Sequence, residues 1–497
     1  MPVDSPSGIY NYYKPIWAKS RVAVAGQESV KSVDEYLPCP AGYDASWYSG
    51  LKRRAYWFDA SGTTTKTYQG AIYRKNPVLT PSFEDSSEDM QELLNSVDPQ
   101  YNDLVTFSTI VTNDVLKTSY AGILVDFDNT DGQRLTQDRA KDLEKRARMI
   151  FYPAESIFHA NSKHIRLWET YSESTDEFYS EVKKQIKVLD ILEVAENGRK
   201  VKKYRQRIYR ELETDGEKTE YAQFGPDFFP TLPSGESFDF IPFQFIGAKN
   251  NDSQPDQPII EGLVNANFQH YGLYSDMREA IHWIRPFIYE TGYQPPTDGQ
   301  ETARVVNPNI MMTSNNPDAK FGILEFNGSG LQWDFKTLEM LEWQMASMGA
   351  DMLKTQKKAS ESADKARIDK SSESSVLATL VNNISAAITK SLNIMMKWNG
   401  QESDYKFQLN TDYDVTMFDA QLMTAINSSV EQRTISQKTA IENFKKGELI
   451  QGSVEDEIEQ IALETGGVEN MDMLIEQVTN IVRAEISNSK PEMEDET

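Results

Sequence analysis

Two aspartates at the end of an apolar run are the first residues whose spacing suits chemistry. Asp126 and Asp128 close the stretch "AGILVDFDN", and alternate residues of a strand point to the same face. Two carboxylates on one face suit a divalent metal, as in a metal-dependent nuclease or phosphoesterase. The letters "DFDNTDG" are also typical of a solvated strand end that enters a turn. We favour the turn and keep the metal site as an alternative.

Other signatures of catalysis are missing from the sequence. It contains no GxxxxGK[ST] phosphate loop, no HExxH pair and no GxSxG elbow. Trp333, Trp343 and the methionines near them are typical of a packing surface rather than of a cofactor box. None of the four histidines follows a metal-ligand spacing; they are His159, His164, His270 and His282. We therefore expect no catalytic residues, no cofactor and no metal.

A strap of lysine, serine and acidic residues lies between two helical patterns. It is contained in "LKTQKKASESADKARIDKSSESSVLATL", which starts at Leu353. Side chains of this kind contact phosphate groups, but the same composition also fits an ordinary solvated loop between helices. Its basic residues are Lys354, Lys357, Lys358, Lys365, Arg367 and Lys370.

Apolar residues at helical spacing predict three long helices around this strap. The first covers 259–283 and ends before Pro286, and the third covers 376–398 and ends before Gly400. The second, 336–353, is expected to pack lengthwise against neighbours because its apolar residues recur at steps of three and four. These residues are Leu338, Leu341, Met345, Met348 and Met352.

Strand patterns surround the predicted helices and give an α+β fold class. Residues 121–127 are typical of a buried strand, and alternating runs between 149 and 245 predict hairpins that form one sheet. Short β-like pieces separated by turn residues fill 287–330, and 405–415 is a further strand candidate. A polar linker at 248–258 marks a boundary, and the chain from about residue 419 is expected to be helical and increasingly acidic.

Composition limits the function classes. The 497 residues carry 76 acids against 51 bases, a formal charge of -25, which argues against coating nucleic acid through a broad basic face. Simple colloidal stability explains this acidity equally well. Cys39 is the single cysteine, so we expect no intrachain disulfide and a reducing compartment. No run of 18 apolar residues occurs, so we expect no membrane span and no secretion by a signal peptide.

Three stretches, in this order, resemble the portal proteins of tailed bacteriophages, the ring-shaped head-to-tail connectors. They are "IPFQFIGAKNNDSQPDQPIIEGLVNANFQHYGLYSDMREAIHWIRPFIYETG", "GILEFNGSGLQWDFKTLEMLEWQMASMGADMLKTQKK" and "ESADKARIDKSSESSVLATLVNNISAAITKSLNIMMKW". The resemblance covers most of the chain and is strongest from about residue 152 to 450. It implies a portal-like fold, whose parts would be a wing at 1–256, stem helices at 257–285 and 333–353, a clip at 286–332, a tunnel loop at 354–375, a long helix returning to the wing at 376–418, and a crown with an acidic tail at 419–497.

The resemblance also implies a role and partners. A portal is a ring of about twelve copies at one capsid vertex, through which double-stranded DNA enters and leaves the virion. The implied partners are DNA, the large terminase subunit, capsid and scaffold proteins and tail adaptors, with no membrane; the chain would be made in the host bacterial cytoplasm. The six basic strap residues would face the DNA, and the five apolar residues of the second helix would lie at the subunit interface. A virion scaffold or adaptor that forms no ring is the remaining alternative.

Overall fold

The computed structural model contains two compact units, residues Met1–Thr411 and Asp412–Thr497, which are described separately. The structure describes residues 2–127, 145–161, 163–174, 179–196, 199–212, 220–283, 287–292, 316–324, 330–350, 363–401, 404–411 and 413, together with scattered residues between 428 and 463. The first unit mixes helices and antiparallel strands, which is compatible with the predicted α+β class. In the second unit, the described residues include the helix α12 (Gln437–Lys446).

Short polar side chains start the helices of the N-terminal region. Ser7, Asp44, Asp59, Ser87 and Asp103 each accept a hydrogen bond from a backbone N–H of the first helical turn, which satisfies a donor that the helix itself leaves unpaired. The helices of this region are α1 (Gly8–Ala25), α2 (Gln27–Lys31), the 3-10 turn η1 (Asp34–Tyr36), α3 (Ala45–Arg54), α4 (Ala60–Ile72), α5 (Glu88–Leu94) and α6 (Leu104–Thr118).

A three-stranded antiparallel sheet forms part of the core of the first unit. Its order is β3-β2-β9, and β2 in the middle is buried along almost its whole length, which confirms the predicted buried strand. Helices α6 and α10 (Ala363–Trp398) pack on it. Gly122 is required in β2 because a Cβ atom there would overlap the ring of Phe243 in β9. The strands are β2 (Tyr120–Phe127), β3 (Ala147–Pro153) and β9 (Phe243–Gly247).

A separate five-stranded sheet follows in the chain. Its strands pair in sequence order as an antiparallel meander, with long central strands that match the predicted hairpins. The prediction of one sheet between 149 and 245 was wrong, because β3 and β9 pair with β2 while the strands between them pair with one another. The strands are β4 (Ile157–Ala160), preceded by the 3-10 turn η2 (Ala154–Ser156), β5 (His164–Ser174), β6 (Ser180–Glu196), β7 (Arg199–Leu212) and β8 (Glu220–Phe228).

Side chains of helix α10 form a regular series of hydrogen bonds with the backbone of the extended segment that follows it. The C-terminal half of α10 lies beside β12 (Lys406–Gln408), which pairs with β1 (Val78–Thr80). Three side chains, spaced four residues apart on the helix, accept hydrogen bonds from backbone N–H groups spaced two residues apart on the extended segment. The oxygen of Ser385 accepts from Leu409 N–H at 3.1 Å, that of Thr389 from Phe407 N–H at 3.0 Å, and that of Asn393 from Tyr405 N–H at 2.8 Å. Four helical residues rise about 6 Å and two strand residues about 6.8 Å, so the two repeats match.

Candidate functional site

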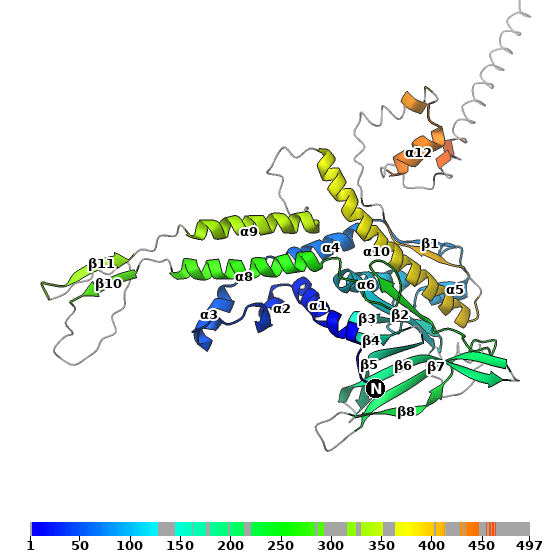
Figure 1. The fold of residues 1–497 in the computed structure, drawn as a ribbon. Helices are drawn as coiled ribbons and strands as arrows, with labels where there is room; N and C mark the ends of the chain where they lie inside the picture. Colours follow the sequence, from blue (N-terminus) through cyan, green and yellow to red (C-terminus); the bar gives the residue numbers. More distant parts are fainter. Residues whose placement is uncertain are drawn as a thin grey trace, which may run out of the picture. The chain divides into compact units, whose positions relative to one another are not determined.

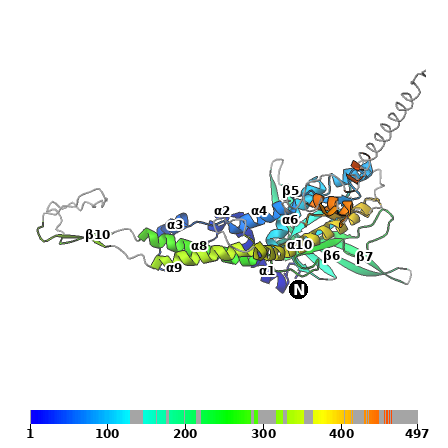
Figure 2. The ribbon, with the colours of Figure 1, turned by 90° about the horizontal axis from the view of Figure 1, so that it is seen from above.

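The helices α8 (Glu261–Trp283) and α9 (Leu331–Met345) form an antiparallel pair, side by side in Figures 1 and 2. A Cβ atom built at Gly262 would lie 3.7 Å from the sulfur of Met348. Farther along α8, the Nε2 atom of His270 lies 3.5 Å from the Oε1 atom of Glu342. The contacts of α8 thus move from Met348, just after α9, to Glu342 within it as the residue number on α8 increases, so the two helices run antiparallel. The bounds of α8 confirm the first predicted helix to within two residues.

The chain between these helices returns as a small hairpin. Strands β10 (Phe287–Thr291) and β11 (Lys320–Leu324) pair antiparallel, as expected for two of the β-like pieces in this region. A third predicted piece, at 305–314, lies outside the described residues. The described order is therefore helix, hairpin strand, hairpin strand, helix.

One side of α9 is the seam that faces α8. Leu338, Leu341 and Met345 are buried, and Met345 belongs to a cluster with Leu263 and Ala266 of α8. The periodicity therefore identified a real packing stripe. Because their own chain covers them, these three side chains are not available to a neighbouring copy, and their assignment to the subunit interface needs correction. Met348 is partly exposed and keeps that assignment as a prediction, whereas Met352 lies outside the described residues.

The opposite side of α9 carries exposed apolar side chains, with the ammonium group of Lys336 over the ring of Trp333. Trp333, Met340 and Trp343 are 71%, 52% and 54% exposed. At about 100° per residue they lie roughly 150° around the helix from the buried seam. We call these three residues the outer face of α9. Within the described residues α9 is thus apolar on two sides, which is typical of a helix that packs against two different surfaces.

The end of α9 differs from the prediction of a helix over 336–353. The helix begins at Leu331 and stops at Met345, followed by a π-helical turn, η4 (Ala346–Ala350). Gly349 in that turn has a φ of +118°, and a Cβ atom there would overlap the hydroxyl of Tyr68 on α4. This backbone conformation, which favours glycine, ends the helical repeat. Residues 351–353 lie outside the described part of the chain.

A buried histidine lies between the two helices. His270 of α8 is almost fully buried and packs against the rings of Phe58 and Tyr274. Burial lowers its pKa, although Glu342 of α9 acts in the opposite direction. The imidazole is therefore held in its neutral form near neutral pH, which is consistent with an apolar seam.

The basic strap falls partly on a helix. Lys354, Lys357 and Lys358 lie outside the described residues. The third helix was predicted to begin at 376, but α10 begins at Ala363, so the backbone of Lys365, Arg367 and Lys370 is helical. Residues 363–375 contain no proline or glycine and several good helix formers, which explains the early start. That these residues contact DNA stays a prediction.

The aspartate alternative is disfavoured by the surroundings of Asp126, whose partner Asp128 lies outside the described residues. The Oδ2 atom of Asp126 accepts a hydrogen bond from Lys187 Nζ at 2.8 Å, and Oδ1 accepts one from Gln206 Nε2 at 2.8 Å. An ammonium group therefore occupies the position that a metal would need. In the described ranges, no group of three or more His, Cys, Asp or Glu side chains is placed to hold a metal ion.

Lys187 belongs to a largely buried polar cluster that joins the two sheets. Its ammonium group also lies 3.3 Å from Glu169 of β5, which accepts hydrogen bonds from Tyr152 and Gln185. Burial opposes the charge on Lys187, but Asp126 and Glu169 outweigh it and raise its pKa. Burial likewise opposes ionisation of Glu169, yet Lys187 and the two hydrogen bonds lower its pKa. The cluster is therefore a charged structural contact rather than a catalytic site.

No helix within the described ranges combines the length and the apolar character needed to cross a bilayer.

The comparisons with known proteins give a partial picture. Residues 259–399, which contain α8, α9 and α10, match the family "Domain of unknown function (DUF4055)". No curated protein matches the chain. Two solved structures are similar. The first is the virion of a native gene transfer agent particle, with 9% sequence identity, a TM-score of 0.34, and coverage of 79% of this chain and 89% of that one. The second is the neck of an empty gene transfer agent particle computed with C6 symmetry, with 11% sequence identity, a TM-score of 0.37, and coverage of 84% of this chain and 96% of that one. TM-scores below 0.5 do not establish a shared fold.

Proposed function

We propose that this chain is a phage portal protein: it forms a ring at one vertex of a capsid, and double-stranded DNA passes through the ring during packaging and ejection. The observation that carries the proposal is the outer face of α9, which is apolar and exposed opposite a seam that its own chain already fills. The order of two antiparallel helices, a β-hairpin and a long returning helix agrees with the resemblance of the sequence to portals.

Ring closure needs a second, different surface for the outer face to meet. Figure 1 shows α9 on one side of α8 and α3 on the other. Trp47 of α3 is 46% exposed, and Tyr56, which follows α3 and contacts Tyr274 of α8, is 51% exposed. Two different apolar surfaces on opposite sides of α8 allow a head-to-tail contact, which closes into a ring when the rotation per copy is suitable.

Charge supports the pairing of α9 with α3 of a neighbouring copy. Helix α3 carries three bases and no acid, and α9 carries more acids than bases. Lys52 and Arg54 are engaged by acids of their own chain, while Arg53 is exposed. Glu339, which borders the outer face of α9, is also exposed. Opposite charges at the rim of an apolar contact fix its register and exclude wrong pairings.

In this proposal the chain has no catalytic residues and acts through its partners. The hairpin region would meet the large terminase subunit and later the tail adaptor, while the body would contact capsid and scaffold proteins. The basic strap would contact phosphates, and the acidity of the whole chain would keep the wall of the tunnel from holding DNA through many ion pairs.

The first test combines negative-stain imaging with the mass of the purified protein in solution. Rings with a central hole are expected, and Trp333→Lys with Met340→Lys should convert them to monomers with an unchanged circular dichroism spectrum. The matched control is Val182→Lys on β6, where the valine is equally exposed. Substitution of Met345 would instead test folding, because that side chain is buried. A wild-type chain that stays monomeric with capsid and scaffold proteins present would point to the non-ring adaptor.

A charge exchange tests the partner surface separately. Glu339→Arg and Arg53→Glu should each weaken the ring, and the double variant should restore it, because the ion pair re-forms with its charges reversed. Rings that tolerate each single change would show that α3 is not the surface that meets α9, while leaving the role of the outer face intact.

A further inference from the structure

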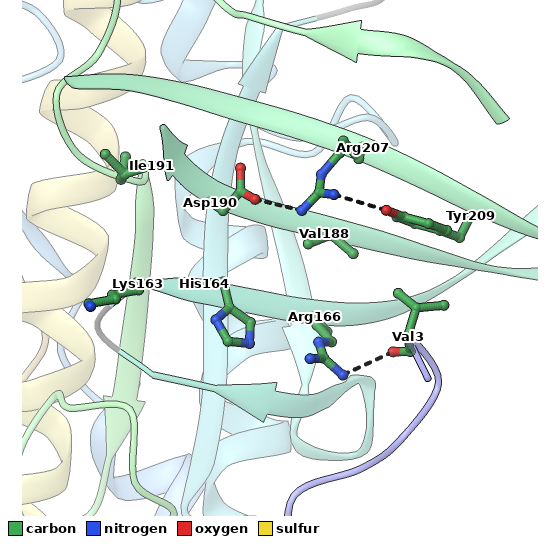
Figure 3. A pocket seen from close by; sticks show the side chains of 9 residues that line it. All are labelled: Val3, Lys163, His164, Arg166, Val188, Asp190, Ile191, Arg207 and Tyr209. Carbon is green, nitrogen blue, oxygen red and sulfur yellow. Dashed lines mark hydrogen bonds and ion pairs between the residues drawn. The ribbon is translucent and has the colours of Figure 1, made fainter. Parts of the chain in front are cut away.

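A basic pocket lies on the five-stranded sheet, away from the two-helix site. It has a volume of about 420 Å³ and is open to solvent. Figure 3 shows Lys163, His164 and Arg166 along one side, with Asp190, Arg207 and Tyr209 along the other. The antiparallel register explains this gathering, because His164 is opposite Asp190, Arg166 is opposite Val188, and Val188 is opposite Arg207.

The acids near the pocket are already used by two arginines. Asp190 accepts hydrogen bonds from Arg205 at 2.8 and 2.9 Å and from Arg207 at 2.6 Å, and Arg205 also bonds Asp227 at 2.8 Å. These two acids and two arginines cancel in charge. The remaining cationic side chains are those of Lys163 and Arg166, partly opposed by the charge of Asp4.

Arg166 is positioned by the N-terminal segment of the chain. Its Nη1 atom donates to the carbonyl oxygen of Val3 at 3.2 Å and to those of Pro2 and Ser5 at 3.4 Å. Carbonyl groups orient a guanidinium without neutralising it. The side chain therefore keeps its full positive charge in a fixed place at the pocket wall.

Two nitrogens of the pocket residues have no hydrogen-bond partner within the described part of the chain: Arg207 Nε, which is a donor, and His164 Nε2, which is a donor when it carries a proton. Both atoms are shielded from solvent. A shielded donor without an acceptor costs free energy. An anion in the pocket would supply acceptors after a small rotation of these side chains.

We propose that this pocket binds a phosphate group. The tetrahedral anion would lie beside Arg166, His164 and Lys163 on one side of the pocket, with Arg207 on the opposite side. A phosphate matches the pocket because it carries up to two negative charges and several acceptor oxygens, which guanidinium groups bind well. The inference does not depend on ring formation and assigns the five-stranded sheet a ligand of its own.

The histidines make the proposed binding depend on pH. His164 is surrounded by Arg166 of its own strand, Asp190 of β6, Arg207 of β7 and the stacked ring of His159 on β4. Burial and the charge of Arg166 lower the pKa of His164, while Asp190 opposes them. A bound anion would raise that pKa again, so affinity should increase as the pH falls through the histidine range.

The test is calorimetric titration of the full chain with inorganic phosphate and with sulfate. Sulfate keeps its double charge between pH 5 and 8, so a rise in its affinity at low pH reports on the protein alone. Arg166→Gln should lower the affinity at least about tenfold, the effect of losing one charged hydrogen bond. His164→Gln should abolish the pH dependence. The control is Lys202→Gln, an exposed base outside the pocket on the same strand as Arg207.

The source of the phosphate is distinguished by two further titrations, with a nucleoside 5′-monophosphate and with a short DNA duplex. Competition by the mononucleotide alone assigns the site to small phosphate compounds, and competition by the duplex assigns it to a nucleic-acid backbone. If none of these anions binds, or if Lys202→Gln weakens binding as much as Arg166→Gln, the proposal is wrong. Binding of an acidic peptide but not of phosphate would also overturn it.

Discussion

The two faces of the five-stranded sheet carry charge in opposite ways. On the face toward β2, Lys187 is buried and is matched by Asp126 and Glu169. On the other face, bases outnumber acids around the pocket that contains Arg166 and Arg207. Burial demands a partner for every charge, whereas a face that solvent reaches tolerates an excess of one sign. An uncompensated basic group on the open face is therefore informative about a ligand, and a compensated one on the buried face is informative about folding.

The largest effect is expected from Lys187→Met. The change leaves Asp126 and Glu169 as two buried carboxylates without their shared cation, so the free energy of unfolding should fall by about 3–5 kcal/mol. Urea denaturation measures it. A loss below about 1 kcal/mol would mean that the buried face does not depend on charge matching.

A smaller effect is expected from Glu169→Gln, which removes one of the two acids that contact Lys187. Loss of this charged partner should cost about 1.5–3 kcal/mol at neutral pH. The pKa of Glu169 is lowered in the folded chain, so its stabilising contribution is complete above about pH 4.3 and is lost as the pH falls through the lowered value. The wild type should therefore lose stability in acid more steeply than the variant. Equal slopes in denaturation curves from pH 3 to 6 would contradict this.

Asp190→Asn sharpens the comparison on the open face. The carboxylate is partly solvated and its two arginines reach water, so the cost in stability should be about 1 kcal/mol or less. The affinity of the pocket for sulfate should rise several-fold, because Asp190, the one acid among the described residues that line it, is neutralised. Calorimetry at constant ionic strength measures the change, and unchanged or weaker binding would argue that Asp190 is needed to shape the site.

The smallest effect is expected from Lys184→Met, three residues before the buried lysine on the same strand and on the opposite face. Lys184 is exposed on β6, so its loss should change the free energy of unfolding by less than about 0.5 kcal/mol. Compared with Lys187→Met, it separates the removal of a lysine from the removal of a buried charge. Similar losses in the two variants would remove the distinction between the faces.

Local patterns in the sequence predicted local structure well. The helix α8, the strand β2, the hairpin of β6 and β7 and the buried stripe of Leu338, Leu341 and Met345 follow from periodicity alone. Periodicity does not show what covers a stripe, and for this reason the same three residues were predicted to face another copy when they face α8.

Long-range pairing was beyond the sequence. Lys187 and Asp126 are 61 positions apart in the sequence, and nothing in the local sequence around either residue predicts that they form a hydrogen bond. The pocket depends on the register between β5, β6 and β7, although the alternating bases of "YRQRIYR" were a visible signal that Arg205 and Arg207 share a face. The division into two sheets also follows from pairing, because each strand alone has the same pattern in either sheet.

The hydrogen bonds between α10 and the segment 405–409 depend on the number of residues that separate the bonding side chains. Three side chains on the helix bond every second residue of the extended segment. One inserted or deleted residue between Ser385 and Asn393 would therefore rotate the side chains before the change by about 100° relative to those after it. A substitution at one of these three residues removes its own contact, whereas a change in spacing prevents the three side chains from bonding the segment in register together. This short region should therefore tolerate changes of residue far better than changes of length, and it is a poor place to insert a tag.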